Sequence, residues 1–187
     1  MSVSFKSTIT GNFFSSTKLL LSDWSDLMSQ KPRGLPQEQQ AKLIGLLNRR
    51  LADAIDLQLQ SRQAYWNVKG PHFMALRELF DKVAQGVEEY ADLIAVRLVQ
   101  LGGVAEGTVH AVARRSSLDE YRLAIANGKS QSEALSTTLI NFARHARYAS
   151  EQATELKDDE TAALFREIAR GIDKWIWFVE TSQQSGS

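Results

Sequence analysis

The sequence contains no cysteine, only three histidines, and a formal net charge of zero. Without cysteine, disulfides, iron–sulfur clusters and thiol catalysis are excluded. A balanced charge provides no strong field that would attract nucleic acid or an anionic membrane surface. No apolar run approaches the roughly 18 residues of a membrane-spanning helix, and the first residues lack the basic head and apolar run of a signal peptide. We therefore expect a cytoplasmic protein that does not enter a membrane.

What the sequence does contain is helical periodicity. Its 187 residues suffice for one domain that buries its own core. Apolar residues recur at spacings of three and four in four long segments, which predict helices over 37–68, 71–101, 130–156 and 159–181. Only tight corners separate the helices within the first pair and within the second pair. The link between the two pairs is much longer and can travel the length of a bundle.

Two helical hairpins joined by one long crossover are typical of a ferritin-like four-helix bundle, so we expect an all-α fold of that class. Within the crossover, the capping-box sequence at 117–120 predicts that a short helix begins there. We assign 37–181 to the bundle domain. Residues 1–36 are expected to form an N-terminal arm that includes a short helix over 17–30, and residues 182–187 a tail.

The segment 71–101 carries the pattern that bears most directly on function. Its apolar residues fall into one continuous stripe: Phe73, Leu76, Phe80, Val83, Val87, Tyr90, Ile94, Leu98 and Leu101. Another side of the same helix holds two pairs of positions four residues apart: Arg77, Asp81, Asp92 and Val96. Asp81 and Asp92 lie roughly 16 Å apart along one helix. They could share a metal only if two copies of this helix pack antiparallel across a twofold axis.

A di-iron centre inside one subunit is not expected. In ferritin-like bundles such a centre uses two Glu-x-x-His pairs that project inward from two helices. Neither pair is present, because no glutamate precedes His72, His110 or His145 by three residues. A single histidine on a helix is more often a surface or hydrogen-bonded residue than a metal ligand.

Three motifs resemble those of the DNA-protection-during-starvation (Dps) mini-ferritins: QAYWNVKGPHF, LRELFDKVAQGVEEYADLIAVRLVQLGG and DDETAALFREIARGIDKWIWFVE. The resemblance runs from about Leu43 to Glu180. It implies a hollow dodecamer of four-helix subunits that oxidises ferrous iron, usually with hydrogen peroxide, and stores the ferric mineral. Some members of the family also bind DNA. The resemblance further implies a homo-oligomer whose dimer contact runs through the 71–101 helix.

The resemblance places the family's ferroxidase site between two subunits. Its five ligand positions fall here at Tyr65, Arg77, Asp81, Asp92 and Val96, so only the two aspartates are retained as metal ligands. Tyrosine is a poor ferrous ligand at neutral pH, valine has no lone pair, and arginine has no acceptor atom. We interpret this as a largely lost site whose occupancy by iron is in question. Our hypothesis is that an Arg77–Asp81 ion pair, near the partner's Asp92, replaces the metal.

Two alternatives remain open. An active ferroxidase could use altered ligands: Tyr65, His72, Asp81 and Asp92. A nucleoid-associated protein would bind DNA through the arm, but residues 1–36 carry four basic and two acidic side chains, a surplus of two positive charges. Because few phosphate contacts could form, DNA binding is expected to be weak or absent. Co-assembly with an active relative would also be compatible with a subunit that has lost its own site.

The family draws iron through acidic threefold pores near the start of the last helix. By resemblance, Glu160 and Asp173 fall at or near pore positions, whereas Ala163 stands where an aspartate is common. Acidic residues also favour a helix N-terminus because of the helix dipole, which accounts for residues 158–160 equally well. We therefore expect iron entry through the pores to be weakened as well.

Overall fold

The computed structural model describes residues 35–70, 72–124 and 128–184. Within these ranges the chain forms helices and no strands: α2 (Gln37–Asn67), α3 (Phe73–Gln100), α4 (Val109–Arg115), α5 (Gly128–Glu155) and α6 (Asp159–Gln184). The expected arm and its helix, up to residue 34, and the last residues of the tail lie outside the described residues. No described helix combines the length and hydropathy needed to span a membrane.

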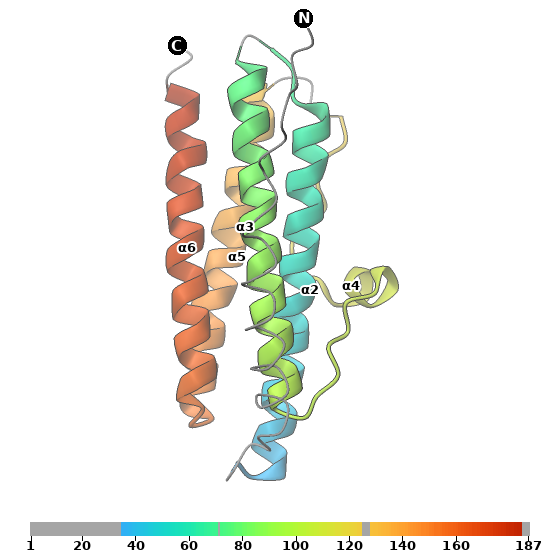
Figure 1. The fold of residues 1–187 in the computed structure, drawn as a ribbon, viewed down its shortest axis with the longest axis vertical. Coiled ribbons are helices and arrows are strands. Elements are labelled where there is room, and N and C mark those ends of the chain that lie inside the picture. Colours follow the sequence, from blue (N-terminus) through green and yellow to red (C-terminus); the bar gives the residue numbers. More distant parts are fainter. Residues whose placement is uncertain (1–34, 71, 125–127, 185–187) are drawn as a thin grey trace, which may run out of the picture.

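Four long helices lie side by side, and α4 packs against α2 at the edge of the bundle (Figure 1). The closest partners are α2 with α3 and α5 with α6, so each pair that the sequence joins by a tight corner is a packed hairpin. The long crossover from α3 to α5 contains α4. The structure therefore confirms the all-α, ferritin-like four-helix bundle with a short helix in the crossover.

The core is built from the predicted stripes. Its largest fully buried side chains come from the four long helices and from the residue that follows α3: Phe80, Phe142, Phe165, Leu43, Leu47, Leu57, Ile94, Leu98, Leu101, Leu135, Leu139 and Ile168. From its first turn to its last, α3 contributes buried apolar residues to this core, beginning with Leu76 and ending with Leu98. Two apolar residues of α2 lie outside the core, because Leu59 is 50% exposed and Trp66 64% exposed on the subunit. Phe73 at the start of α3 is also exposed, at 42%.

Helices α3 and α6 approach each other through two glycine–aromatic contacts. A β-carbon at Gly86 would lie 2.9 Å from Nε1 of Trp175, and one at Gly171 would lie 1.8 Å from Oη of Tyr90. Each aromatic ring thus lies where any larger side chain on the facing helix would collide with it. This explains the positions of both glycines inside long helices, where glycine is otherwise unfavourable.

The helix ends are set by local backbone geometry. Gly102, with φ of +76°, follows α3, and the N–H of Gly103 donates to the carbonyl of Leu98 at 3.0 Å. This six-residue closure is the Schellman motif, for which glycine is preferred at the left-handed position. Lys157 takes the same left-handed conformation after α5, with φ of +60°, and Asp158 then caps α6 by accepting the N–H of Thr161 at 3.3 Å.

The short helix of the crossover lies earlier than predicted. This helix is α4. The capping-box residues 117–120, where the helix was predicted to begin, are not helical. The reason is that Ser117 donates both its backbone N–H, at 2.7 Å, and its hydroxyl, at 3.1 Å, to Asp53 of α2. Ser116 donates to Asp56 at 2.5 Å. Both serines therefore fasten the crossover to α2 and neither serves as a helix cap.

Candidate functional site

Asp81, a predicted metal ligand, is held by two side chains of its own subunit. Arg62 on α2 forms an ion pair with Oδ1 through Nη1, and Gln85 donates to Oδ2 at 2.8 Å. The side chains of Arg62 and Asp81 are 29% and 32% exposed, so the pair is largely sheltered. Both oxygens of this carboxylate therefore already have a donor, and its negative charge already has a counter-ion.

Arg77 does not pair with Asp81, so the predicted intrahelical ion pair was wrong. Its guanidinium carbon lies 4.5 Å from the centroid of the Tyr65 ring, and Nη2 donates to the Tyr65 hydroxyl at 3.3 Å. The guanidinium carbon of Arg62 lies 5.8 Å from the same centroid. Both guanidinium groups thus lie within reach of the Tyr65 ring, and an arginine over the ring face is attracted by the aromatic quadrupole. Arg62 takes the place that the sequence reasoning had given to Arg77.

Arg62 could have been found from the hairpin alone. In two antiparallel helices joined by a tight corner, residues equally far from the corner lie opposite each other. Arg62 precedes Pro71 by nine residues and Asp81 follows it by ten, while Tyr65 and Arg77 each lie six residues away. The corner therefore pairs Arg62 with Asp81 and Tyr65 with Arg77, whereas spacing along one helix alone pairs Arg77 with Asp81.

The remaining two positions lie further along α3. Asp92 is exposed and has no ion pair within the described chain, and Val96 is half-buried. Within the described ranges no three histidine, aspartate or glutamate side chains gather in a group that could hold a metal ion. One subunit thus brings together Tyr65, Arg77 and Asp81 but not the altered-ligand set that includes His72 and Asp92.

The residues present do not fit a ferrous ion within one subunit. Three of the five positions offer a phenol, a guanidinium and an isopropyl group, and a guanidinium only donates hydrogen bonds. The one carboxylate among the gathered residues is occupied by Arg62. A divalent cation next to Asp81 would face two fixed positive charges, which would repel it.

Known proteins that resemble this chain in sequence and structure agree with the fold and with the residue positions described above. A ferritin-like domain model matches residues 44–185. A DNA protection during starvation protein of Agrobacterium fabrum is 38% identical over 153 residues, covering 82% of this chain and 94% of the relative. The chain belongs to the Dps family. Among solved structures, DpsA14 from Streptomyces coelicolor matches with a TM-score of 0.77 at 32% identity, covering 82% of this chain and 91% of that one. A Dps from Mycobacterium smegmatis matches with a TM-score of 0.77 at 27% identity, covering 82% of this chain and 93% of that one.

The two acidic side chains at the expected pore positions of this Dps-family chain are also paired with arginine. Glu160 forms an ion pair with Nη1 of Arg97, although its side chain is 79% exposed. Asp173 accepts two hydrogen bonds from Nη2 of Arg147, at 2.5 and 2.6 Å. Three of the four acids that the Dps resemblance assigns to iron are therefore neutralised by an arginine of the same subunit, and Asp92 is the exception.

Arg97 also organises the start of α6. Its Nη2 contacts Asp158 at 2.6 Å, and its Nε donates to Thr161 at 3.0 Å. Burial raises the pKa of the Asp158 carboxyl, but hydrogen bonds from Arg97 and Thr161 outweigh it and hold this pKa below its ordinary value. Asp158 therefore stays ionised as a helix cap and ion-pair partner, which is a structural role.

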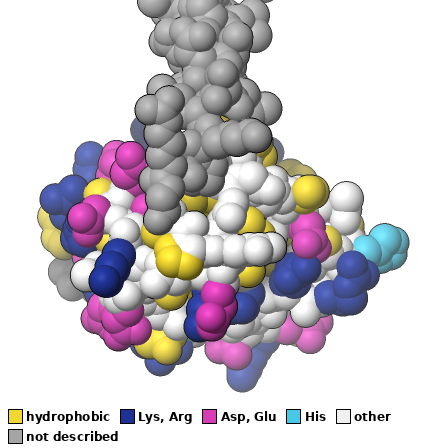
Figure 2. Space-filling view, turned by 90° about the horizontal axis from the view of Figure 1, so that it is seen from below, with side chains coloured by type: hydrophobic (Ala, Val, Ile, Leu, Met, Phe, Trp, Pro, Cys, Tyr) yellow, Lys and Arg dark blue, Asp and Glu magenta, His cyan; other side chains and the backbone are white. Residues whose placement is uncertain are grey.

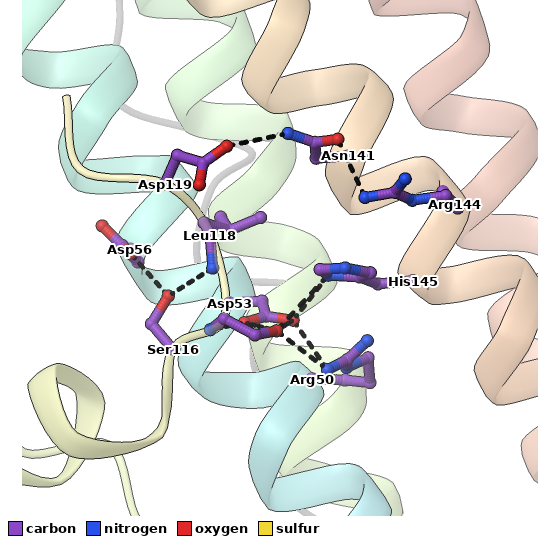
Figure 3. A network of polar contacts seen from close by, with 10 residues as sticks. Arg50, Asp53, Asp56, Ser116, Leu118, Asp119, Asn141, Arg144 and His145 are labelled. Carbon is purple, nitrogen blue, oxygen red and sulfur yellow. Dashed lines mark hydrogen bonds and ion pairs between the residues drawn. The ribbon is translucent and has the colours of Figure 1, made fainter.

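A second polar cluster, formed by Arg50, Asp53, Ser117 and His145, joins α2, the crossover and α5 (Figure 3). Asp53 is fully buried, and Nη2 of Arg50 lies 3.0 Å from its Oδ2. Nδ1 of His145 lies 3.3 Å from the same oxygen and 3.4 Å from the Ser117 hydroxyl. Because one ring nitrogen faces both the serine and the aspartate, the histidine cannot pass a proton from one side of its ring to the other. The cluster therefore holds the crossover against α2 and α5, and it is not a hydrolytic triad.

The His145 contact predicts a pH dependence of stability. Burial lowers the pKa of His145, and Arg50 and Arg144 add to this, whereas Asp53 opposes it. A histidine whose folded pKa is lowered binds its proton more weakly in the folded state than in the unfolded state. Stability is therefore highest above the ordinary histidine pKa near 6.5 and falls as pH drops below it.

We expect the melting temperature to fall from pH 7.5 to pH 5.5, and His145→Gln to make that fall shallower. A matched His110→Gln variant, changed at an exposed histidine of α4, should keep the slope, and equal slopes in all three proteins would contradict the assignment.

Proposed function

We propose that this chain is a subunit of a hollow, dodecameric Dps-type shell that serves iron sequestration and protection from oxidative stress in the cytoplasm, and that it has largely lost the inter-subunit ferroxidase site. The observation that carries the proposal is the Arg62–Asp81 ion pair, formed where a ferrous ion would need a free carboxylate. The replacements at Tyr65, Arg77 and Val96 support it, because none supplies a good ferrous ligand.

The arginine partners of Glu160 and Asp173 support the same proposal for iron entry. An acidic pore attracts cations through uncompensated negative charge. With each acid beside an arginine of its own subunit, the attraction at these two positions is reduced. Such a subunit would form part of the shell wall and store iron slowly, or would assemble together with an active relative that supplies the oxidation step.

DNA binding finds little support in the described residues. At the end of the bundle where α2 begins and α5 turns into α6, basic side chains lie among acidic ones without a patch of one sign (Figure 2). Non-specific DNA binding depends on clustered lysine and arginine that release counter-ions from phosphates. We therefore keep the shell as the proposed function, and a salt-dependent gel shift tests the nucleoid alternative.

The experiment that tests the proposal measures assembly and iron oxidation on the same purified protein. Sedimentation is expected to give one species of about twelve subunits. Adding ferrous iron and hydrogen peroxide should give ferric product no faster than in buffer, while an active Dps relative under the same conditions gives rapid oxidation. Rapid oxidation by this protein would favour the altered-ligand ferroxidase and overturn the lost site. A species that stays monomeric would overturn the shell.

A further inference from the structure

A groove of about 440 Å³ lies between the beginning of α2 and the end of α5. These two helix ends lie at the same end of the bundle (Figure 1). Ala41, Gly45 and Leu46 line the groove from α2 and Leu156 lines it from α5, together with exposed charged side chains such as Arg49. A groove that combines apolar and charged residues in this way fits an amphipathic helix.

Gly45 is the residue of this groove that the described structure leaves unexplained. Glycine inside a helix is unfavourable, and the aromatic ring that approaches each of them accounts for Gly86 and Gly171. At Gly45 a β-carbon would meet only Nη1 of Arg49, at the ordinary contact distance of 3.8 Å. Nothing in the described part of the chain therefore requires a glycine at this position. Its presence indicates that another group approaches α2 here.

The sequence that precedes α2 supplies a segment that fits the groove. Residues 1–34 lie outside the described residues, but their sequence predicts a helix over 17–30. Apolar side chains fall on one side of that helix: Leu20, Leu21, Trp24, Leu27 and Met28. A helix of this length is marginal in water by itself, so its apolar side needs a surface to cover.

We propose that residues 17–30 fold back as a helix into the groove of their own chain, with Trp24 over Gly45. Two prolines and Gly34 separate this segment from α2, so the chain can reverse its direction there. In antiparallel helices joined by a corner, residues equally far from the corner lie opposite each other. Counted from Gly34, Trp24 lies ten residues before the corner and Gly45 lies eleven after it. The contact repeats the glycine–aromatic pairs that join α3 to α6.

The charges agree with the same register. Asp23 lies eleven residues before the corner and is therefore level with Gly45. Arg49 lies one turn further along α2, but its guanidinium folds back to that level, as the 3.8 Å distance from Nη1 shows. Arg49 is exposed and makes no ion pair within the described ranges, whereas Lys42 already pairs with Glu38 at 2.7 Å. Asp23 supplies the carboxylate that Arg49 lacks.

The other edge of the predicted helix carries the opposite charge. At 100° per residue, Asp23 and Lys18 fall on opposite edges of the apolar side. The groove likewise has Arg49 on its α2 side and Glu155 on its α5 side. The inference does not depend on the proposed shell. It gives the arm a fixed place on the bundle, in contrast to the free arm that DNA binding would use.

The test exploits the absence of cysteine from the chain. Leu27 and Ala41 each lie seven residues from Gly34, so the docked helix brings them together in a Leu27→Cys/Ala41→Cys protein. The matched control is Ser29→Cys/Ala41→Cys. Residue 29 lies on the opposite side of the predicted helix but is nearer to Ala41 along the chain, so a free arm would link it at least as fast.

Oxidised glutathione is added to the whole protein, and the disulfide is followed by non-reducing electrophoresis and by mass analysis of peptides. We expect the Leu27→Cys pair to link within one chain at least about tenfold faster than the control, because docking raises the effective concentration of its two thiols. Equal rates for the two pairs, or links that form only between chains, would overturn the proposal. Neither rate depends on how many subunits assemble, so failure here leaves the shell proposal standing.

Trypsin cleavage after Lys18 measures the same contact without cysteine. Since a protease cuts the open form of a segment, Gly45→Leu and Arg49→Asp should each speed this cleavage by at least about tenfold. Adding Asp23→Arg to Arg49→Asp exchanges the two charges and should restore protection. Arg166→Asp, at an exposed position of α6, controls for the change of charge and should leave the rate unchanged. Circular dichroism confirms that each variant keeps its bundle, and if Gly45→Leu does not, the charge exchange decides alone. Cleavage rates that the variants leave unchanged, or an exchange that restores nothing, would contradict the docked arm.

Discussion

Replacing Asp53 by alanine is expected to lower the free energy of unfolding by about 3–5 kcal/mol, the range for breaking a buried ion pair from one side. Asp53 is fully buried, and Arg50 is 7% exposed, so the arginine would keep its charge in the interior without a counter-ion. The Nε atom of Arg50 already lacks a hydrogen-bond partner within the described structure, so little is left to compensate it. The backbone N–H of Ser117 would lose its acceptor as well. Urea unfolding followed by circular dichroism measures the change.

Two further variants separate the causes. Asp56→Ala, one turn along α2, removes a half-buried carboxylate that binds Ser116 and Gln60 but no cation of the described chain, and should cost only about 1 kcal/mol per lost hydrogen bond. The double variant Arg50→Met/Asp53→Leu removes both charges from the interior, and should recover most of the loss because buried ion pairs are often replaceable by apolar side chains. A loss below about 1 kcal/mol for Asp53→Ala would show that water reaches Arg50 and that the cluster does not fasten the crossover.

The bundle could be predicted from the sequence because its signal is repeated. Each long helix contributes several buried apolar residues at one period, so one exception such as Leu59 does not change the result. The predicted ends of the long helices were also correct within about three residues, because Gly70, Gly102 and Asp158 are residue types that favour helix ends. The crossover has no repeated signal. Its capping-box sequence is equally suited to bind a neighbouring carboxylate, and only the position of Asp53 on α2 decides between the two uses.

The residues of the candidate site could be predicted from the sequence, but the contacts between them could not. The resemblance supplied Tyr65, Arg77 and Asp81, and the structure does bring these three together at the hairpin. It could not supply Arg62, because that residue gains its role only when α2 lies against α3. Intrahelical neighbours can be read from spacing, but the choice between two arginines for one carboxylate depends on side-chain direction across the helix pair.

Restoring the lost ligands is expected to create peroxide-dependent oxidation of ferrous iron, and the extent should depend on Arg62. The triple variant Tyr65→His, Arg77→His and Val96→Glu returns nitrogen and carboxylate donors to the three replaced positions. Adding Arg62→Met frees Asp81. It should raise both the rate of iron oxidation and the affinity for Zn²⁺, a probe that is not oxidised, by a further factor of about 10–100. This is the range for groups that contact a metal ligand without binding the metal. Stopped-flow absorbance of the ferric product and calorimetry with Zn²⁺ give the two values. If the unchanged protein already oxidises iron as fast as the triple variant, the loss of the site is disproved.

The matched control for this series is Arg62→Lys in the triple background. Lysine keeps one positive charge near Asp81, whereas methionine keeps a similar apolar stem without charge. Two unit charges about 4 Å apart near a protein surface interact by roughly 4 kcal/mol, and a divalent ion doubles the repulsion. The affinity of the lysine variant for Zn²⁺ should therefore stay close to that of the triple variant. If lysine and methionine raise the affinity for Zn²⁺ equally, Arg62 acts only by filling space or by hydrogen bonding. If only methionine raises it, the charge of Arg62 is what keeps a metal from Asp81.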